Sequence, residues 1–481
     1  MKSSGPVVVL FNNDLRVRDH AALAAAAEGG NPVIPLFMLD DAMAGEWVRG
    51  SASRWWLHES LTALSLSLAA LGAPLVLRQG NTRSVVIDIL RETGADAVYL
   101  SRGFEPWSEA FEHDLRTALR DEGASLKRFA GTLLHDPHEL KTQAGGPFRV
   151  YTPFWRALTR AGVRRVQASP KRLIPVAVPL ASDDLAAWRL QPTKPDWATG
   201  LRETWTPGEA GARARLGQFL DDAVMTYGTD RDRPGTEGTS RLSPHLHFGE
   251  ISPATCWHAA LASGERDPAR QQGVETFAKE LAWREFSYHL LTHWPTLPAK
   301  PFRVEFQNFP WAERAGDIER WQHGMTGFPI VDAGMRELWA TGWMHNRVRM
   351  ITASFLIKDL LIPWTKGEAW FWDCLVDADL ASNAASWQWV AGSGADAAPY
   401  FRIFNPVTQS RKFDPDGVYV RRWVPEIAGL DSAHIHAPWE APVPALVSAG
   451  VTLGKTYPAP MVDHARARGA ALAAYAAIRS A

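Results

Sequence analysis

Short apolar runs alternate with amphipathic stretches over roughly the first 130 residues and fade afterwards, and this change of pattern constrains the fold more than any other feature. The apolar runs, which we expect to form buried strands, occupy residues 7–11, 33–39, 74–77 and 97–100. Helices are expected between them at residues 21–28, 53–71 and 82–93, with Ser53 as one N-cap. This alternation predicts a doubly wound parallel α/β domain over residues 1–130.

Two further regions follow. Residues 131–205 contain eight prolines and are expected to form a connector with one short helix at residues 154–161. From residue 206 onward the strand signals vanish and helical periodicity dominates, for example over residues 274–291 and 334–361. We therefore expect residues 206–481 to form an all-helical domain.

The composition is that of an ordinary globular protein, with 46% hydrophobic and 21% charged residues and a formal net charge of -1. Nucleic-acid binding would therefore need a local basic surface. Cys256 and Cys374 lie far apart and outside any metal-binding spacing, so neither a disulfide framework nor a metal site is expected. The first ten residues do not resemble a signal peptide, and no apolar stretch approaches the ~20 residues that span a bilayer. A cytoplasmic location without a membrane contact is expected.

Residues 377–389 form the most unusual segment. Asp377, Asp379, Asn383, Trp387 and Trp389 stand there among small residues. Carboxylates and amides are poor helix-interior residues unless they find partners. A bound ligand that is both polar and aromatic would supply such partners.

A second segment, residues 235–244, follows Tyr227 and is rich in glycine and hydroxyl residues. At a helix start such residues leave backbone N–H groups free to bind a phosphate, although a simple helix cap explains the same pattern.

Two helical segments carry groups suited to bases and phosphates. Glu280 and Trp283 share one helix face, which suits stacking on a base and bonding its edge, whereas Glu280 with Arg284 is also a plain helical ion pair. Asn346 and Met350 share a face of the second segment, and Arg347 and Arg349 beside them are candidates for phosphate contacts.

These motifs resemble those of the cryptochrome/photolyase family, and in particular of its bacterial members that repair cyclobutane pyrimidine dimers. The matching segments stand in the family's order and spacing, at residues 238–243, 283–285, 342–347, 387–389 and 401–406. The similarity extends over nearly the whole chain. It implies an α/β antenna-type domain, a helical domain that binds FAD and DNA, and a monomer that acts on DNA containing pyrimidine dimers.

The resemblance also assigns the flavin site. The residues that it implies around FAD are Tyr227, Thr239, Ser240, Arg241, Leu242, Ser243, Phe277, Asp377, Asp379 and Asn383. Asn383 falls where the family places a residue against the flavin N5. Photolyases carry Asn there, plant-type cryptochromes Asp and animal-type ones often Cys, so Asn383 favours repair over blue-light sensing. The chain also ends at Ala481, without the long polar extension that sensors often carry.

The catalytic set implied by the resemblance is Glu280, Trp283, Asn346, Met350, Asn383 and Trp389. The flipped-out dimer would lie between Trp283 and Trp389, with Glu280 bonding a pyrimidine edge. Relatives that repair (6-4) photoproducts have two His at the positions of Asn346 and Met350 because that reaction needs a proton donor, so a (6-4) photolyase is the weaker alternative. DNA contacts are implied for Arg231, Glu280, Trp283, Asn346, Arg347 and Gln409.

The family mechanism implied here is electron transfer from excited, reduced FAD to the dimer. A tryptophan chain supplies electrons to the resting flavin, and Trp387, Trp364 and Trp311 match it. Residues 104–107 resemble a segment that binds an antenna chromophore, with Met38, Glu105 and Trp107 as candidates. A folate, methenyltetrahydrofolate, is favoured over a deazaflavin, and an ordinary loop is the alternative for this segment.

Overall fold

The computed structural model describes residues 5–312, 315–397 and 401–480. The chain folds as two compact units. The first comprises Met1–Asp222 and Ser240–Pro295, and the second comprises Ala223–Thr239 and Thr296–Ala481. The domain boundaries predicted near residues 130 and 205 stay predictions, because these units are defined by packing alone.

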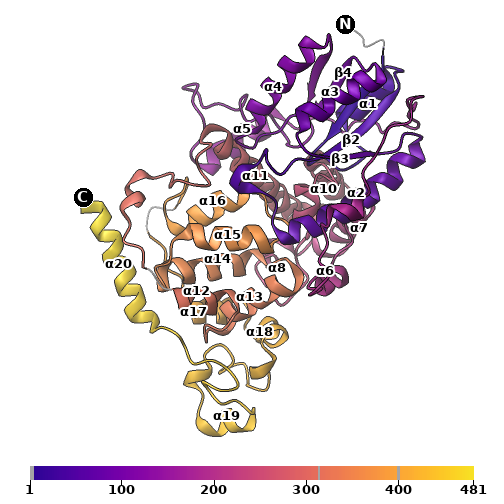
Figure 1. The fold of residues 1–481 in the computed structure, drawn as a ribbon. Helices are drawn as coiled ribbons and strands as arrows, with labels where there is room; N and C mark the ends of the chain where they lie inside the picture. The colour runs from indigo at the N-terminus through magenta and orange to yellow at the C-terminus, as the bar shows by residue number, and fades with distance from the viewer. Residues whose placement is uncertain (1–4, 313–314, 398–400, 481) are drawn as a thin grey trace. The chain divides into compact units, whose positions relative to one another are not determined.

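The first unit contains a five-stranded parallel sheet of order β3-β2-β1-β4-β5 (Figure 1). Its strands are β1 (Val7–Phe11), β2 (Val33–Leu39), β3 (Val76–Gln79), β4 (Ala97–Ser101) and β5 (Ser125–Phe129). The doubly wound α/β prediction is confirmed. The fifth strand was not predicted, because β5 lies at the sheet edge and its sequence, SLKRF, lacks a continuous apolar run.

Burial explains why the other strands could be predicted. All five residues of β1 are buried, as expected for a central strand covered on both faces. On one face, Val86 and Ile89 of α3 and Leu115 of α4 pack against β1, β2 and β4. The order of the strands reverses between β1 and β4, and in sheets of this kind ligands bind outside the carboxyl ends of the strands at such a point.

The helices of the first unit are α1 (Ala21–Glu28), α2 (Ser51–Leu71), α3 (Thr82–Thr93), α4 (Ser108–Asp121), α5 (Tyr151–Ala161), α6 (Thr199–Thr204), α7 (Glu209–Gln218), α9 (Ser243–His247), α10 (Pro253–Arg266) and α11 (Gln271–His293). The prediction for Ser53 is wrong, since Gly50 is the N-cap of α2 and Ser53 lies buried inside the helix. The connector helix α5 begins three residues earlier than predicted, at Tyr151.

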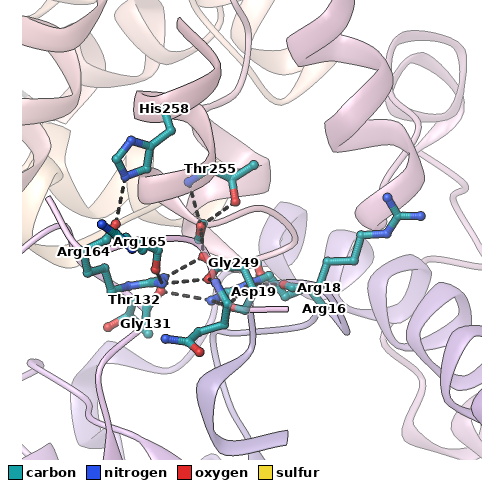
Figure 2. A network of polar contacts seen from close by, with 12 residues as sticks. Arg16, Arg18, Asp19, Gly131, Thr132, Arg164, Arg165, Gly249, Thr255 and His258 are labelled. Atoms are coloured by element: carbon teal, nitrogen blue, oxygen red, sulfur yellow. Dashed lines mark hydrogen bonds and ion pairs between the residues drawn. The ribbon is translucent and has the colours of Figure 1, made fainter. Parts of the chain in front are cut away.

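A polar network around Arg16 and Asp19 ties distant loops of the first unit together (Figure 2). The buried Arg16 guanidinium donates to the carbonyl oxygens of Asp19, Gly131 and Gly249 at 2.9–3.0 Å. Both oxygens of Asp19 accept hydrogen bonds from Arg164, each at 2.7 Å. The loop after β1, the segment after β5 and the connector are therefore held at one point.

The helical part of the second unit consists of α8 (Tyr227–Asp230), α12 (Ala315–Gln322), α13 (Pro329–Thr341), α14 (Asn346–Ser354), the π-helical turn η6 (Phe355–Asp359), α15 (Trp364–Cys374), α16 (Leu380–Ala391), α17 (Pro406–Phe413), α18 (Val418–Trp423), α19 (Val443–Ser448) and α20 (His464–Ser480). The described residues after 206 contain no strand, so the all-helical prediction is confirmed. None of the described helices has the length and apolar character needed to cross a membrane.

The helical periodicity predicted over residues 334–361 is divided among α13, α14 and η6. Residues 334–361 do not form a single helix, because α13 ends at Gly342 with a φ of 66°. The buried His345 then starts α14 by accepting a hydrogen bond from the Arg347 N–H. The break places Asn346 in the first turn of a new helix.

The Asp19 network predicts a pH-dependent stability. Burial alone would raise the pKa of Asp19, but hydrogen bonds from Arg164, the Gln167 N–H and Ser252 lower it below its ordinary value. The stability that this carboxylate contributes is therefore present near neutral pH and lost as the pH falls through the lowered pKa. Asp19→Asn leaves Arg164 without its charge partner and should lower the free energy of unfolding by about 3 kcal/mol at pH 7, measured by urea denaturation.

The matched control for this prediction is Arg91→Gln, which breaks an exposed ion pair with Glu122 in the same unit and should leave the unfolding midpoint unchanged. Equal effects of the two substitutions would contradict the role given to Asp19.

Candidate active site

Helix α16 carries the central side chains of the unusual segment at residues 377–389. Asp379 caps its start by accepting a hydrogen bond from the Ser382 N–H at 2.8 Å, and Gly392 ends it in the left-handed conformation. Asn383 and Trp387 lie one turn apart on the buried side of the helix. The sequence therefore brings a polar amide and an indole onto one helix face.

The C-terminal end of α16 is fixed by further polar contacts within the second unit. The buried Gln388 side chain bonds three backbone groups, the carbonyls of Leu297 and Lys300 and the N–H of Phe302. The buried Lys358 of η6 donates to the carbonyl of Ala391, the last residue of α16, at 2.8 Å. Burial lowers the pKa of Lys358 well below its usual value. The position of α16 along its axis is thereby set.

The amide of Asn383 has a defined orientation. Its Nδ2 donates to the carbonyl of Glu368 on α15 at 3.1 Å. Oδ1 lies on the other side of the amide group and is the atom that remains to accept a hydrogen bond from a ligand N–H. Glu368, which sets this orientation, lies 15 residues away in sequence and was not predicted.

Asp377 forms a buried ion pair that the sequence pattern did not indicate. Both of its oxygens accept from Arg349 Nη2, at 3.1 and 2.8 Å, and Arg349 Nε donates to the carbonyl of Met344. Arg349, a candidate for phosphate contacts, is thus used inside the unit to hold Asp377. The buried carboxylate thereby has a partner for both of its oxygens.

The three predicted relay tryptophans lie in one hydrophobic cluster. Trp387 is 2% exposed and Trp364 is 4% exposed, while Trp311 packs against the same cluster and is only partly buried. Exposure thus decreases from Trp311 to Trp364 and Trp387, the order in which a relay would carry electrons inward.

The Trp387 ring is tightly enclosed. It meets Phe371 edge-on at 5.0 Å between centroids, and a methyl group on Gly367 would approach its outer carbons to 2.1 Å. The absence of a side chain at Gly367 is therefore what leaves room for the indole.

Helix α14 carries the pair that bears on lesion choice. Asn346 is exposed in its first turn and Met350 is half-buried one turn later. Arg347 pairs with Asp232 at 2.8 Å and lies over the ring of Phe413. Its cation is therefore anchored beside Asn346.

The remaining predicted residues of the second unit lie as follows. Tyr227 is buried, with the guanidinium of Arg231 5.8 Å from its ring centroid. Trp389 is half-buried, and the guanidinium of Arg402 lies 5.8 Å from its ring centroid. Gln409 is half-buried on α17. Thr239 is half-buried at the last position before the chain passes to the first unit.

In the first unit, the segment at residues 240–243 leads into α9, which begins at Ser243 and has only five residues. Ser240 Oγ accepts from the Leu242 N–H at 3.5 Å, Leu242 is buried, and Arg241 has a positive φ of 50°. Because α9 is so short, its dipole adds little to anion binding, and the phosphate site at this helix start stays a prediction.

Helix α11 carries Phe277, Glu280 and Trp283. Phe277 is buried against Phe219, with ring centroids 4.8 Å apart. Glu280 and Trp283 are half-buried one turn apart, as the sequence predicts. Trp283 lies face to face with Tyr151 of α5, a contact that no local pattern indicates because it joins residues 132 positions apart.

The antenna candidates of the first unit do not converge on one cavity. Glu105 lines a cavity of about 20 Å³ together with Asn13 and Ser101, at the carboxyl edge of β1 and β4. Met38 is buried in the sheet core, and Trp107 precedes α4 as its N-cap. A cavity of about 590 Å³ shares Arg102 and Phe104 with the smaller one, and this larger volume is typical of ligand pockets.

Within the described ranges, no group of three or more His, Cys, Asp or Glu is arranged to hold a metal ion. The chemistry available at α16 is instead that of a fixed amide, an arginine-paired carboxylate and an indole in a cluster with two further tryptophans. Fold and site together define a protein with a doubly wound α/β part and a helical part built to hold a polar aromatic cofactor.

Comparison with known proteins gives the same result. Residues 7–172 match the DNA photolyase family model, and residues 277–477 match the FAD binding domain of DNA photolyase. A deoxyribodipyrimidine photo-lyase of Agrobacterium fabrum is 53% identical over 99% of this chain and 98% of its own, and Cryptochrome-2 of Arabidopsis thaliana is 37% identical over 97% and 78%. The crystal structure of a bacterial class III photolyase from Agrobacterium tumefaciens superposes with a TM-score of 0.96, at 52% identity over 99% of this chain and 98% of that one.

The chain belongs to the DNA photolyase family, whose members include the cryptochromes, and it carries that family's FAD-binding domain. The sequence-based predictions of this family and of a photolyase-type enzyme are confirmed.

The residues present fit a flavin. The isoalloxazine ring offers N–H donors at its edge, and Asn383 presents an oriented carbonyl oxygen for one of them. Asp377, held by Arg349, supplies a fixed acceptor on the same unit.

The motif at residues 283–285 predicts a second pH dependence, through Glu285. Burial raises the pKa of Glu285 from 4.5 to about 7, although Arg284 and the backbone N–H groups of Leu134 and His135 act in the opposite direction. Because the pKa of Glu285 is higher in the folded state than in the unfolded state, folding favours the protonated carboxyl group. The protein is therefore most stable, with respect to this group, below about pH 4.5, and it loses this stability as the pH rises through 7. Between these pH values wild type should lose about 3 kcal/mol of unfolding free energy relative to Glu285→Gln, by urea denaturation at each pH. Parallel pH profiles of the two proteins would contradict this.

Proposed function

We propose that this chain repairs cyclobutane pyrimidine dimers in DNA in a light-dependent reaction that uses FAD. The observation that carries the proposal is the side chain of Asn383, buried on α16 with its amide oxygen oriented to accept a hydrogen bond, one turn from Trp387. The name of the relative from Agrobacterium fabrum supports the lesion class.

The proposed flavin contacts come from residues 227–243, Phe277 and α16 with Asp377. When bound, reduced FAD supplies the light-excited electron that splits the cyclobutane ring. Asn383 holds the flavin edge through its oxygen, and Asp377 and Asp379 bind the body of the cofactor. The Arg349 ion pair supports this, because it holds the Asp377 carboxylate in place through both of its oxygens.

The proposed lesion contacts are Trp283 and Trp389 as stacking surfaces and Glu280 as a hydrogen-bonding partner of a pyrimidine edge. Arg231, Arg347 and Gln409 contact the DNA strand. Arg347 suits this role because Nη2 pairs with Asp232 and Nη1 donates to the Met350 sulfur, and each of these nitrogens carries a second N–H that a phosphate can accept.

The residues of α14 determine which lesion is repaired. Asn346 and Met350 have no proton to give near neutral pH, so they can shape and bond a dimer but cannot protonate one. This favours cyclobutane dimers over (6-4) photoproducts. A blue-light sensor without repair activity is the second candidate, and the similarity to Cryptochrome-2 of Arabidopsis thaliana keeps it open to test.

We also propose an antenna chromophore in the first unit, a folate in preference to a deazaflavin, near Glu105, Trp107 and Met38. Glu105 supports this through its place at the carboxyl edge of β4, beside the reversal point of the sheet.

The test of the proposed function is to illuminate the purified, reduced protein with two oligonucleotides, one with a cyclobutane thymine dimer and one with a (6-4) photoproduct. The cyclobutane dimer should disappear in the light and persist in the dark, while the (6-4) product persists in both. Loss of the (6-4) product would favour the alternative substrate. Loss of neither, in a protein that holds flavin, would favour the sensor.

The proposed relay makes a separate prediction. Trp364→Phe should slow photoreduction of oxidised flavin at least tenfold, because phenylalanine is much harder to oxidise than tryptophan. Repair by chemically prereduced protein should be unchanged, since the relay acts only on resting flavin. The absorbance of the flavin under blue light measures photoreduction, and the loss of cyclobutane dimers measures repair.

The control is Trp188→Phe, a buried tryptophan of the first unit that the proposed relay does not include. It should photoreduce as wild type does. Normal photoreduction of the Trp364→Phe protein would show that electrons take another route.

A further inference from the structure

Trp283 is already stacked before any DNA is present. Tyr151, the first residue of α5, lies parallel to it with ring centroids 3.7 Å apart and planes inclined by 4°. At this separation the two ring faces are in van der Waals contact, so no base can enter between them. Trp283 is nevertheless half-buried rather than buried, so part of this residue is exposed to solvent.

Tyr151 is itself firmly held. Its ring is buried, and its hydroxyl donates to the carbonyl of Lys279, one turn before Trp283 on α11, at 2.7 Å. Phe286 meets both rings edge-on, at 6.0 Å from Tyr151 and 5.8 Å from Trp283. Covered on one face and blocked at one edge, the Trp283 indole has little freedom to rotate.

We propose that Tyr151 is a positioning residue for lesion recognition, which fixes the plane of Trp283 so that a single open face stacks on the flipped-out pyrimidine. This rests on the proposed function. A side chain that is mobile before binding must be ordered on binding, which weakens binding by roughly threefold to tenfold. A stacking surface that is already ordered avoids this loss. Tyr151 touches no reacting atom, so it acts through Trp283 alone.

The experiment compares the affinity for an oligonucleotide carrying a cyclobutane dimer with the affinity for the undamaged duplex. Tyr151→Ala should weaken binding of the damaged DNA by about threefold to tenfold and leave binding of undamaged DNA unchanged. Tyr151→Phe keeps the ring stack and loses only the hydroxyl bond, so it should stay within about twofold of wild type. It also keeps the proposal testable if Tyr151→Ala folds poorly.

A double-mutant cycle separates positioning from general packing. If Tyr151 acts through Trp283, removing it from a Trp283→Ala protein should cost no further affinity, whereas independent effects would multiply. The control Tyr99→Leu removes a half-buried tyrosine from the same unit and should not alter selective binding.

The outcomes are distinct for the two proposals. Wild type that binds both duplexes equally would refute the proposed function. A second outcome is that wild type binds damaged DNA selectively and that Trp283→Ala weakens this binding whereas Tyr151→Ala does not. This outcome would overturn the role of Tyr151 and leave the proposed function standing. Multiplicative losses in the cycle would also overturn it.

Discussion

The fixed position of helix α16 is the constraint on which the candidate site depends. Three groups set it, since Asp379 caps the start, Gln388 bonds the backbone of residues 297–302, and Lys358 binds the last carbonyl. These polar side chains are buried, and each would cost free energy if it lost its partner. The helix can therefore neither slide nor rotate without breaking several of these contacts at once. The positions of Asn383 and Trp387 are fixed for the same reason, because both residues lie on this helix.

In three other places, a side chain of the candidate site is held in position by a second residue that contacts it. Arg349 holds Asp377, Glu368 orients Asn383, and in the first unit Tyr151 covers one face of Trp283. No such residue need touch a ligand. Their common effect is that the geometry of the site is established before binding, so that less binding free energy is spent on ordering side chains.

The sequence predicts those features that depend on neighbours along the chain. The strands at residues 7–11 and 33–39 agree to the residue because they are continuous apolar runs, and the helix at 82–93 agrees because Asn81 and Gly94 mark its ends. Strand β5 was missed because an edge strand needs no such run. The partners Glu368 and Tyr151 could not be predicted, because their contacts join helices that only the folded chain brings together. The motif residues themselves could be named because five segments in order match a known family.

The central claim is that α16 presents Asn383 to a flavin. It is tested most directly by an experimental structure of the protein with FAD bound. We predict that Asn383 Oδ1 lies within hydrogen-bonding distance of the flavin N5 while Nδ2 stays on the Glu368 carbonyl. A flavin whose N5 faces a different residue, or an Asn383 amide turned so that Nδ2 faces the flavin, would contradict it.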